Sequence, residues 1–396
     1  MTSSDFISMQ LNQYKDTALY IGSANYPFPQ TLKSRQYPFD MNAAEYTVGN
    51  RLFPGCEILD EIETQGNNYA LDFLHLSDEY ETILSIYSGT QANQVVYNAI
   101  LNPGDRIIAF SESSGGHASH LSFLKKYYQV IEYSFNFNTG IDYNVLEVLV
   151  EKHKPKLLIA GSTLYPEGFD YSQLKTICKT SKTLLLADIS HTALYVATGA
   201  HPPVNEYADF ITYTTHKTTR GMRSAILHYK KDFKDKILSS LCSISQGAPK
   251  YSDILANTIM FEELKKTDIK EYQRKVFSYS DQFRVLCKEY NLKTIGTGNS
   301  HLMIIELSET PFNGEDIKNI AAQNNIFITN HLTKQNEYIR LGFLTSATLS
   351  MEFHDFIYIC EIFLRLIRAP HKNCKEDVSQ IMRKYTNRFY KENYNL

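Results

Sequence analysis

The segment "DFITYTTHKTTRGMRSAILHYK", residues 209–230, decides the fold prediction. A β-branched apolar run ends at His216 and Lys217, and a second apolar run follows after Arg220 and Arg223. A lysine that forms a Schiff base must be partly desolvated and have a lowered pKa, and neighbouring cationic groups favour both. An ordinary surface lysine needs no such setting. We therefore interpret Lys217 as a reactive amine at the mouth of a buried strand.

The segments that precede it predict an α/β fold. Short apolar strands alternate with longer segments of helical periodicity, which is typical of βαβ units and of a sheet covered by helices on both faces. In such sheets, ligands bind where strands end and helices begin. Strands are expected at residues 81–87, 105–111, 127–135, 156–162, 183–190, 209–215 and 224–230, and helices at residues 90–101, 142–154 and 172–181.

The chain of 396 residues is long enough for two or three domains. Residues 1–30 lack a clean hydrophobic period and are predicted to form an N-terminal arm. Residues 31–255 are predicted to form the large domain, and residues 256–396 a smaller C-terminal α/β domain. In the smaller domain, helices are expected at residues 252–266, 270–290 and 353–367, and a strand at residues 300–307.

The composition limits the partners of the protein. Hydrophobic residues make up 43% and charged residues 21%, with a formal net charge of −3, which argues against a nucleic-acid or membrane surface as the main partner. Six dispersed cysteines, together with the lack of a signal peptide and of a long apolar run, predict a cytoplasmic protein with reduced thiols. His117 and His120 lack further ligands nearby, so no metal site is expected.

The loop "YSGTQAN", residues 87–93, is the first candidate binding element. Its small residues turn a strand into a helix and expose backbone N–H groups and two hydroxyls. A helix N-terminus binds a phosphate dianion through such donors and through its dipole. The same residue types also suit a plain helix N-cap, so both interpretations stay open at this point.

The stretch "LLLADISH" places Asp188 directly after a strongly apolar strand. A carboxylate there costs solvation unless it meets a cation. A pyridinium nitrogen is a suitable partner, because an anion keeps the ring protonated and electron-accepting, and a helix N-cap is the alternative. The candidate phosphate cradle (residues 87–93), Asp188 and Lys217 follow one another along the chain, each at the end of a strand. This is the order expected of a pyridoxal phosphate (PLP) enzyme of the aspartate aminotransferase architecture.

From about residue 22 to about residue 360, the chain resembles the serine hydroxymethyltransferase family. The resemblance is carried by "GSANYPFPQ", "GNRLFPGCEILDEIE", "YSGTQANQVVYNAILNPGD", "SSGGHASH", "ADISHTALYVATGAHPP", "TTHKTTRG" and "YIRLG". It implies a fold type I PLP-dependent transferase, with a mostly parallel seven-stranded sheet flanked by helices in the large domain. It also implies a homodimer in which two subunits share each active site.

The resemblance assigns roles to individual residues. Lys217 would hold the cofactor as a Schiff base, Asp188 would pair with the ring nitrogen, and His117 would stack on the ring. The remaining cofactor contacts would be Ser88, Gly89 and Thr90 at the phosphate, Thr163 and His191 near the ring hydroxyl, His216 and Thr214 beside the lysine, and Gly247 in "SISQGAPK", which faces the neighbouring subunit. The substrate contacts would be Arg340 at the carboxylate, Glu45 at the β-hydroxyl, and Ser23 and Phe53.

The sequence departs from the family pattern where the family binds tetrahydrofolate. Leu52 and Phe53 replace a tyrosine pair, and Glu112 and Ala118 replace two leucines of the folate loop. Cys242 replaces a phenylalanine that faces the partner subunit. A pterin on Leu52 would lose an aromatic pair energy of roughly 0.5–1.5 kcal/mol. These changes predict a degraded folate site.

The amino-acid site is altered as well. Ala43 stands two residues before Glu45 where the family has tyrosine, although Tyr46 lies in the same loop, and Ala24 stands at a glutamate position. The cofactor residues are thus retained while the substrate residues are changed, which predicts altered substrate use.

We therefore expect folate-independent aldol or retro-aldol chemistry on a β-hydroxy-α-amino acid such as threonine or serine, through a glycine quinonoid. The enzyme would act as an aldolase, or as a transaldolase that passes the glycine unit to a second aldehyde. Two alternatives keep PLP: a folate-dependent serine hydroxymethyltransferase, and other chemistry at Cα such as transamination, decarboxylation or racemisation. A non-catalytic scaffold is the alternative from another class, and the joint retention of Lys217, Asp188 and His117 argues against it.

Overall fold

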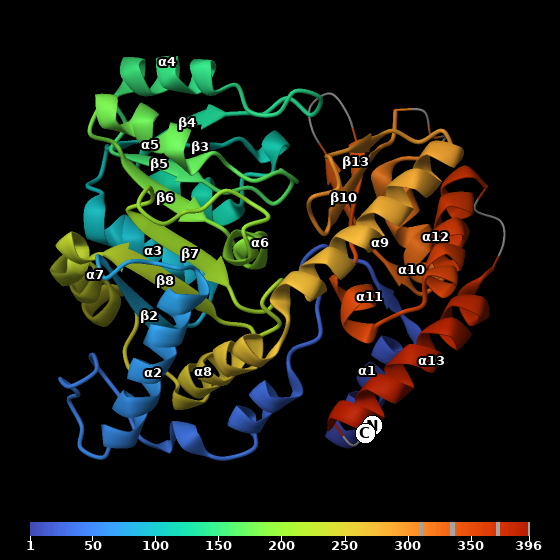
Figure 1. Ribbon diagram of the computed structural model, residues 1–396, viewed down its shortest axis with the longest axis horizontal. Helices are drawn as coiled ribbons and strands as arrows, with labels where there is room; N and C mark the ends of the chain where they lie inside the picture. The colour runs from blue at the N-terminus through green and yellow to red at the C-terminus, as the bar shows by residue number, and fades with distance from the viewer. Residues whose placement is uncertain (309, 311, 333–336, 370–372, 395–396) are drawn as a thin grey trace. The chain divides into compact units, whose positions relative to one another are not determined.

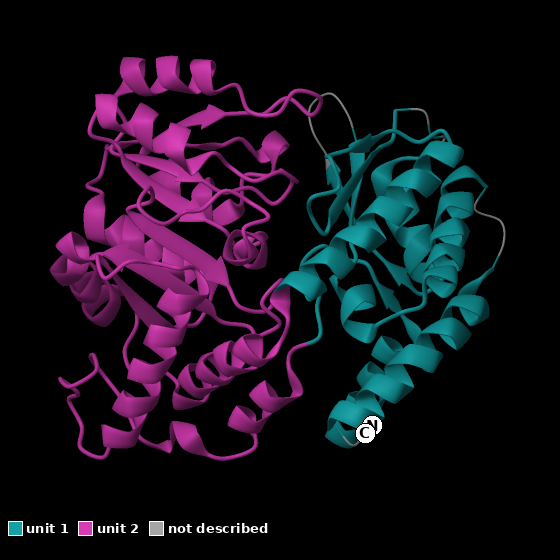
Figure 2. Cartoon of the chain, in the orientation of Figure 1, with its two compact units in different colours: residues 1–26, 270–396 teal, residues 27–269 magenta. Residues whose placement is uncertain are grey.

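The computed structural model describes residues 1–394 apart from 309, 311, 333–336 and 370–372. The chain divides into two compact units, which Figure 2 shows in different colours. Unit 2 is residues 27–269, and unit 1 combines residues 1–26 with the C-terminal part from residue 270. The division into an arm and two domains at residues 30 and 255 stays a prediction.

Unit 2 is built on a seven-stranded sheet with the order β2-β8-β7-β6-β5-β3-β4 (Figure 1). Its strand β8 pairs antiparallel with both neighbours, whereas the pairs from β7 to β4 are parallel. The predicted mostly parallel sheet is therefore confirmed. The strands are β2 (Tyr80–Ile86), β3 (Arg106–Phe110), β4 (Gln129–Tyr133), β5 (Leu157–Ala160), β6 (Leu184–Asp188), β7 (Phe210–Thr214) and β8 (Ala225–Lys230).

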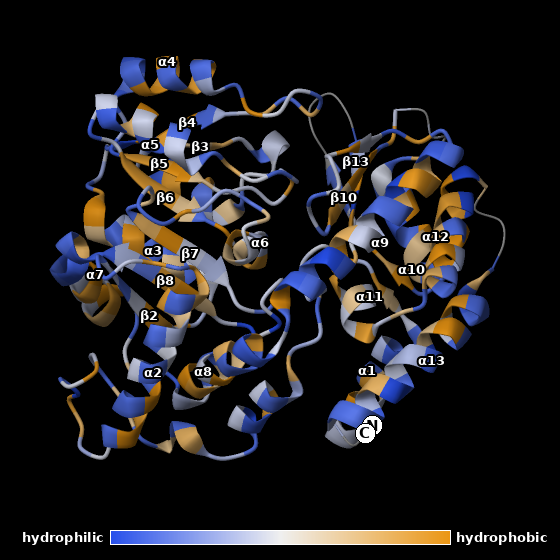
Figure 3. Ribbon diagram, viewed as in Figure 1, coloured by the Kyte–Doolittle hydropathy of each residue, from blue (hydrophilic) through white to orange (hydrophobic). Residues whose placement is uncertain are grey.

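Helices flank this sheet, as the sequence predicts (Figure 1). They are α2 (Glu57–Phe73), α3 (Gly89–Ile100), α4 (Tyr143–His153), α5 (Tyr171–Thr180), α6 (Ala193–Thr198), α7 (Lys234–Ser240) and α8 (Tyr251–Lys266), and a π-helical turn (Leu241–Ser245) follows α7. The apolar runs of β5 and β6 stand out as hydrophobic in Figure 3. Such runs are expected of strands that are buried on both faces.

Alternation along β7 assigns the two faces of the sheet. Phe210 belongs to the core that includes α3 and α7 residues, and the hydroxyl of Thr212 donates to a side chain of α3. Tyr213 points to the opposite face, where its ring lies 6.5 Å from that of Phe73 in α2, which in turn contacts Phe261 in α8. The carboxyl ends of the parallel strands thus lie between two helical layers.

Unit 1 contains an antiparallel sheet with the order β12-β13-β10-β9, and a short parallel pair of β1 with β11. The expected strand near residues 300–307 and two of the three expected helices, at residues 270–290 and 353–367, lie in unit 1, whereas the helix expected at residues 252–266 forms as α8 of unit 2. The strands are β1 (Ala18–Leu19), β9 (Thr294–Ile295), β10 (Leu302–Glu306), β11 (Ile326–Phe327), β12 (Thr329–Leu332) and β13 (Glu337–Gly342), and the helices are α1 (Ser3–Asp16), α9 (Ile269–Glu289), α10 (Gly314–Gln323), α11 (Leu344–Leu349), α12 (Phe353–Arg368) and α13 (Lys375–Tyr394).

Helix α1 was not expected from the sequence. Thr2 and Asp5 form a capping box that starts it, and none of its residues is buried. Because a helix without a buried face needs no apolar period, hydrophobic periodicity could not reveal it. Among the described helices, none is both long and apolar enough to cross a membrane.

The contact between α2 and α8 depends on Gly66. A Cβ at this position would overlap the side chains of Thr258 in α8 and Leu84 in β2. We expect Gly66→Ala to lower the free energy of unfolding by about 1–3 kcal/mol, because the helices would have to move apart. Chemical denaturation measures this change. The exposed neighbour Thr64 serves as the control, since Thr64→Ala should change stability little, and an equal effect of both variants would contradict the packing argument.

Candidate active site

The loop that carries Lys217 joins β7 to β8 and is closed by its own hydrogen bonds. The carbonyl oxygen of Thr215 accepts from the Gly221 amide at 2.6 Å and from the Thr219 hydroxyl at 2.7 Å. Arg220 adopts a left-handed conformation with φ of 57°. The lysine therefore projects from a loop with a defined backbone shape at the end of the sheet.

The cationic surroundings that the sequence predicts for this loop are present. His216 accepts at Nε2 from the guanidinium of Arg223 at 3.1 Å. Burial, followed by the charges of Lys217 and Arg223, lowers the pKa of His216 to about 3. The imidazole is therefore neutral, and its proton must lie on Nδ1, since Nε2 accepts. That Nδ1 is buried and has no hydrogen-bond partner among the described residues.

The predicted phosphate cradle forms the N-terminus of α3. Ser88 is its N-cap, with Oγ accepting from the Gln91 amide at 3.2 Å, and Gly89 and Thr90 begin the helix. A Cβ on Gly89 would lie 2.8 Å from the methyl group of Thr214, so the cradle packs directly on the end of β7. The Thr214 hydroxyl is buried and has no partner within the described chain. Ser88 thus caps the helix, and the same helix N-terminus also offers N–H donors that suit an anion, so the two interpretations of this loop are compatible.

Asp188 lies at the end of β6 and accepts three hydrogen bonds. Oδ2 accepts from Asn93 at 3.0 Å and from Nε2 of His120 at 3.1 Å, and Oδ1 accepts from the Ser190 amide at 3.1 Å. Burial alone would raise the pKa of Asp188. The hydrogen bond and charge of His120, with the bonds from Ser190 and Asn93, instead hold the pKa well below its usual range. The carboxylate stays ionised.

Asn93 connects this carboxylate to His117. Its amide nitrogen lies 3.2 Å from Oγ of Ser119, which lies 2.8 Å from Nδ1 of His117, and its oxygen accepts from Thr212 at 2.8 Å. The Ser119 amide also donates to Nδ1 of His117. His117 and Asp188 are therefore oriented by one network.

Asn93 and His120 were not among the residues predicted for the site. Both lie inside the motifs that indicate it, one in the cradle loop and one in "SSGGHASH". From the sequence, His120 could be considered only as a metal ligand, because no sequence pattern shows that its side chain forms a hydrogen bond with Asp188.

Two further predicted cofactor residues lie near this network. The hydroxyl and amide of Thr163 both donate to the carbonyl oxygen of Gly115, at 3.1 and 2.9 Å. His191 is buried in the turn between β6 and α6. A Cβ on Gly161 would lie 2.7 Å from Cβ of Asp188, so the end of β5 packs closely against the carboxylate.

Gly247 follows the π-helical turn after α7. Gln91 in α3 donates to the Ser245 carbonyl oxygen at 3.0 Å and to the Gln246 side chain at 2.9 Å. This places the segment beside the first turn of the cradle helix of the same chain. A Cβ on Gly247 would have no described heavy atom within 4 Å.

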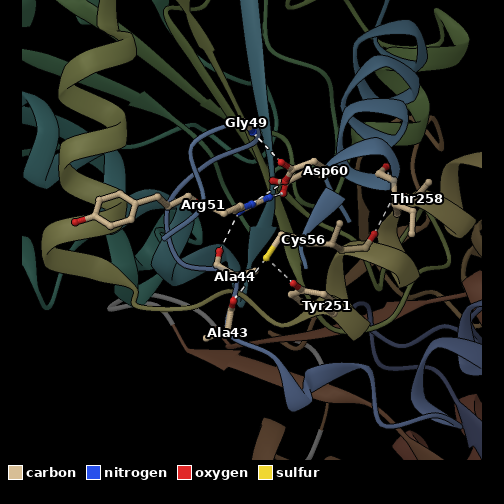
Figure 4. A network of polar contacts seen from close by, with 12 residues as sticks. Ala43, Ala44, Gly49, Arg51, Cys56, Asp60, Tyr251 and Thr258 are labelled. Atoms are coloured by element: carbon tan, nitrogen blue, oxygen red, sulfur yellow. Dashed lines mark hydrogen bonds and ion pairs between the residues drawn. The ribbon is translucent and has the colours of Figure 1, made fainter. Parts of the chain in front are cut away.

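Glu45 lies half-buried in a loop that Arg51 fastens to α2 (Figure 4). Arg51 donates to the carbonyl oxygens of Ala44 and Tyr46 on either side of Glu45, at 3.0 and 2.6 Å. In the same loop, Leu52 and Phe53 are 58% and 40% exposed. The two residues that replace the tyrosine pair thus present apolar surface on the outside of the chain.

The predicted substrate residues Arg340 and Ser23 belong to unit 1. Arg340 lies in β13, where Nε donates to the Thr329 hydroxyl at 3.3 Å, and burial lowers the pKa of its guanidinium. Gly22, the residue before Ser23, packs on β13, because a Cβ there would lie 3.5 Å from Nε of Arg340. The structure therefore places the segment before Ser23 beside Arg340.

Comparison with known proteins shows to which family the chain belongs. The family model described as serine hydroxymethyltransferase matches residues 4–348. The chain belongs to the serine hydroxymethyltransferase family. It is 33% identical over 315 residues to a serine hydroxymethyltransferase of Dehalococcoides mccartyi, covering 78% of this chain and 75% of that one. The enzyme of the same name from Ehrlichia canis is 35% identical over 319 residues (79% and 75%), and that of Endomicrobium trichonymphae 31% over 377 residues (92% and 90%).

Membership of the serine hydroxymethyltransferase family makes this chain a fold type I, PLP-dependent enzyme. The residues present fit that cofactor. The N-terminus of α3, the buried Thr214 hydroxyl and Nδ1 of His216 offer donors for a phosphate. The ionised Asp188 offers an acceptor for a protonated ring nitrogen. Lys217 would supply the amine for a Schiff base.

The neutral state of His216 predicts a pH dependence of stability in the cofactor-free protein. The folded pKa of about 3 lies below the ordinary 6.5, so its contribution is complete above pH 6.5 and is lost as the pH falls toward 3. We expect the free energy of unfolding to decrease by about 2 kcal/mol between pH 8 and pH 5 on account of this residue. Denaturation curves at both pH values measure the decrease.

The His216→Gln variant should lack that share of the pH dependence. Thr64→Ala, which changes an exposed residue and no titratable group, provides the control and should keep the wild-type pH dependence. A His216→Gln variant with the full wild-type slope would contradict the assignment.

Proposed function

We propose that this serine hydroxymethyltransferase family member cleaves or forms the Cα–Cβ bond of a β-hydroxy-α-amino acid, such as threonine or serine, without tetrahydrofolate. The observation that carries the proposal is the contrast between the two halves of the site. Lys217, Asp188 and His117, the residues proposed for the cofactor, are all retained, and one hydrogen-bond network joins the side chains of Asp188 and His117, whereas Leu52 and Phe53 replace the tyrosines of the folate site.

Bound PLP supplies an electron-accepting ring that stabilises negative charge at Cα of the substrate. The chain would contribute the rest. The amine of Lys217 holds and releases the cofactor, and Asp188, kept ionised by its three donors, holds a proton on the ring nitrogen. Arg340 would bind the substrate carboxylate, which suits a buried guanidinium whose pKa burial lowers. Ser23 would lie at the same carboxylate.

In the cleavage direction, Glu45 would accept the proton of the β-hydroxyl. The electron pair of that O–H bond forms the carbonyl of the released aldehyde, and the pair of the Cα–Cβ bond stays with Cα. Protonation of Cα then gives glycine, and addition of Cα to a second aldehyde gives a new β-hydroxy-α-amino acid. No oxidant and no one-carbon carrier is needed for either outcome.

The name shared by the relatives favours a second candidate, folate-dependent interconversion of serine and glycine. Under that reading, tetrahydrofolate would bind through residues other than the missing tyrosines. Other chemistry at Cα, namely transamination, decarboxylation or racemisation, has no specific support among the described residues.

We also propose a homodimer in which each subunit completes the other's site. Unit 2 exposes large apolar side chains along residues 43–53, which include Glu45, and on the residues around them. A second copy of the chain would cover these side chains. They are Tyr37, Phe39, Met41, Tyr46, Leu52, Phe53, Ile58 and Ile244. All six cysteines are free, which fits the cytoplasm as the proposed compartment.

The cofactor assignment predicts the spectrum of a lysine variant. Lys217→Ala should lose the visible absorbance of the Schiff base that the wild-type protein is expected to show with PLP, because the variant lacks the amine that would form it. Absorbance spectra of both proteins test this, with Lys182→Ala as a control on a lysine outside the site. An unchanged spectrum in Lys217→Ala would remove the assignment.

The reaction assignment predicts products. With threonine as the substrate, we expect glycine and acetaldehyde at a rate that added tetrahydrofolate does not raise, since the bond cleavage needs no carrier. Mass analysis of labelled threonine and serine, with and without tetrahydrofolate, measures this. A rate with serine that rises at least about tenfold on addition of tetrahydrofolate would establish the second candidate instead.

A further inference from the structure

A buried arginine holds the loop that carries Glu45. We call residues 43–53 the Glu45 loop. The side chain of Arg51 is 4% exposed, and its Nη1 donates to the carbonyl oxygens of Ala44 and Tyr46. These two carbonyl groups belong to the residues directly before and after Glu45, so one guanidinium holds the backbone on both sides of that residue. Figure 4 shows the hydrogen bond from Arg51 to Ala44.

The other nitrogens of the same guanidinium bind α2. Nε donates to Asp60 at 2.8 Å, and Nη2 forms an ion pair with Glu63, whose side chain is 8% exposed. Asp60 also accepts from the Gly49 amide of the loop at 2.8 Å. The loop is thus tied to the first two turns of α2 at several points.

The loop contains strain next to Glu45. Tyr46 has φ of 70°, a left-handed conformation that is costly for an aromatic residue. Strained residues persist where the surroundings over-determine the backbone. Here the surroundings are Arg51 on the Tyr46 carbonyl oxygen and the hydrogen bond from the Leu52 amide to the Glu45 carbonyl oxygen at 3.2 Å.

Burial affects the two partners of this ion pair differently. Burial raises the pKa of Glu63 despite the attraction and hydrogen bond of Arg51, whereas burial alone would lower the pKa of Arg51, and the charges and hydrogen bonds of Glu63 and Asp60 raise it. Replacing buried ion pairs by apolar residues is often neutral or stabilising. The planar fork of arginine does provide what a lysine or an apolar residue cannot, namely simultaneous bonds to two carbonyl groups and two carboxylates.

We propose that Arg51 is a positioning residue that sets the place of the Glu45 carboxylate for proton transfer. The inference rests on the role given to Glu45 under the proposed function. A general base must come within hydrogen-bond reach of the proton that it accepts, and a displacement of about 1 Å costs on the order of a hundredfold in rate. The guanidinium holds the main chain on both sides of Glu45. Only the side-chain torsions of Glu45 are then left to determine where its carboxylate lies.

The test is the Arg51→Lys variant of the full-length, PLP-loaded protein. Lysine keeps a positive charge between Asp60 and Glu63 but cannot bond both loop carbonyl groups at the same time. We expect kcat for threonine cleavage to fall by about 10- to 100-fold with KM changed less than about threefold, since Arg340 would still bind the substrate carboxylate while the proton transfer to Glu45 loses its alignment. Exchange of the Cα proton of glycine, which needs no β-hydroxyl base, should keep its wild-type rate.

A second readout is independent of catalysis. Amide hydrogen exchange across residues 44–52 should become about tenfold faster in Arg51→Lys, because the loop loses its carbonyl anchors. The matched control is Lys265→Gln, which removes another cation paired with α2, at Asp72 on the surface, and should change neither readout. If Arg51→Lys fails to fold, Glu63→Gln takes its place, since it loosens the arginine without removing it.

Glu45→Gln separates the outcomes. If Glu45→Gln loses activity and Arg51→Lys adds no further loss in that background, the positioning role is supported. If Glu45→Gln loses activity while Arg51→Lys keeps the wild-type kcat, or loses glycine exchange to the same extent as cleavage, the positioning role is overturned and the proposed function stands. If Glu45→Gln keeps the wild-type kcat, the role of Glu45 fails, and the positioning role fails with it.

Discussion

The carboxylate of Asp188 is the constraint on which the cofactor half of the site depends. A buried, ionised carboxylate at the end of an apolar strand is stable only if donors replace the water that it has lost. The structure supplies them from three separate segments, through Asn93 of α3, His120 of the loop after β3, and the amide of Ser190. Satisfying one charge therefore fixes the relative positions of a helix and two loops at the edge of the sheet.

That requirement also explains why the network reaches His117. Asn93 can satisfy Asp188 only if its own oxygen and its second N–H find partners, and it finds them in Thr212 and Ser119. Ser119 in turn contacts the ring of His117. The polar groups of the site thus form one connected set, in which each member orients the next.

Much of the fold and of the cofactor site could be predicted from the sequence, because both are marked by local sequence patterns. The strands and helices of unit 2 carry clear apolar periods, and Lys217 and Asp188 stand at strand ends, so the sheet and the order of the motifs followed from the residues themselves. The partnership of His120 with Asp188 could not be predicted in this way, since the two are 68 positions apart and no local pattern relates them. The same holds for Arg51, which sequence reasoning read only as part of a family motif. Helix α1 could not be predicted from hydrophobic periodicity because it buries none of its residues.

The pairing of β7 with β8 has a consequence for how the chain can change in evolution. Lys217 lies in the connection between two adjacent antiparallel strands, in which Phe210 pairs with Tyr229 and Thr214 with Ala225. A slip of β8 by one residue would turn each of its side chains to the other face, exchanging His228 with Leu227. An insertion or deletion in the connection must therefore be absorbed within residues 215–224, where the hydrogen bonds to the Thr215 carbonyl oxygen already fix the backbone. We expect length variation to be tolerated in surface connections of unit 2 and rejected in residues 215–224. The lysine that is predicted to bind the cofactor therefore lies in a segment whose length the packing of β7 and β8 constrains.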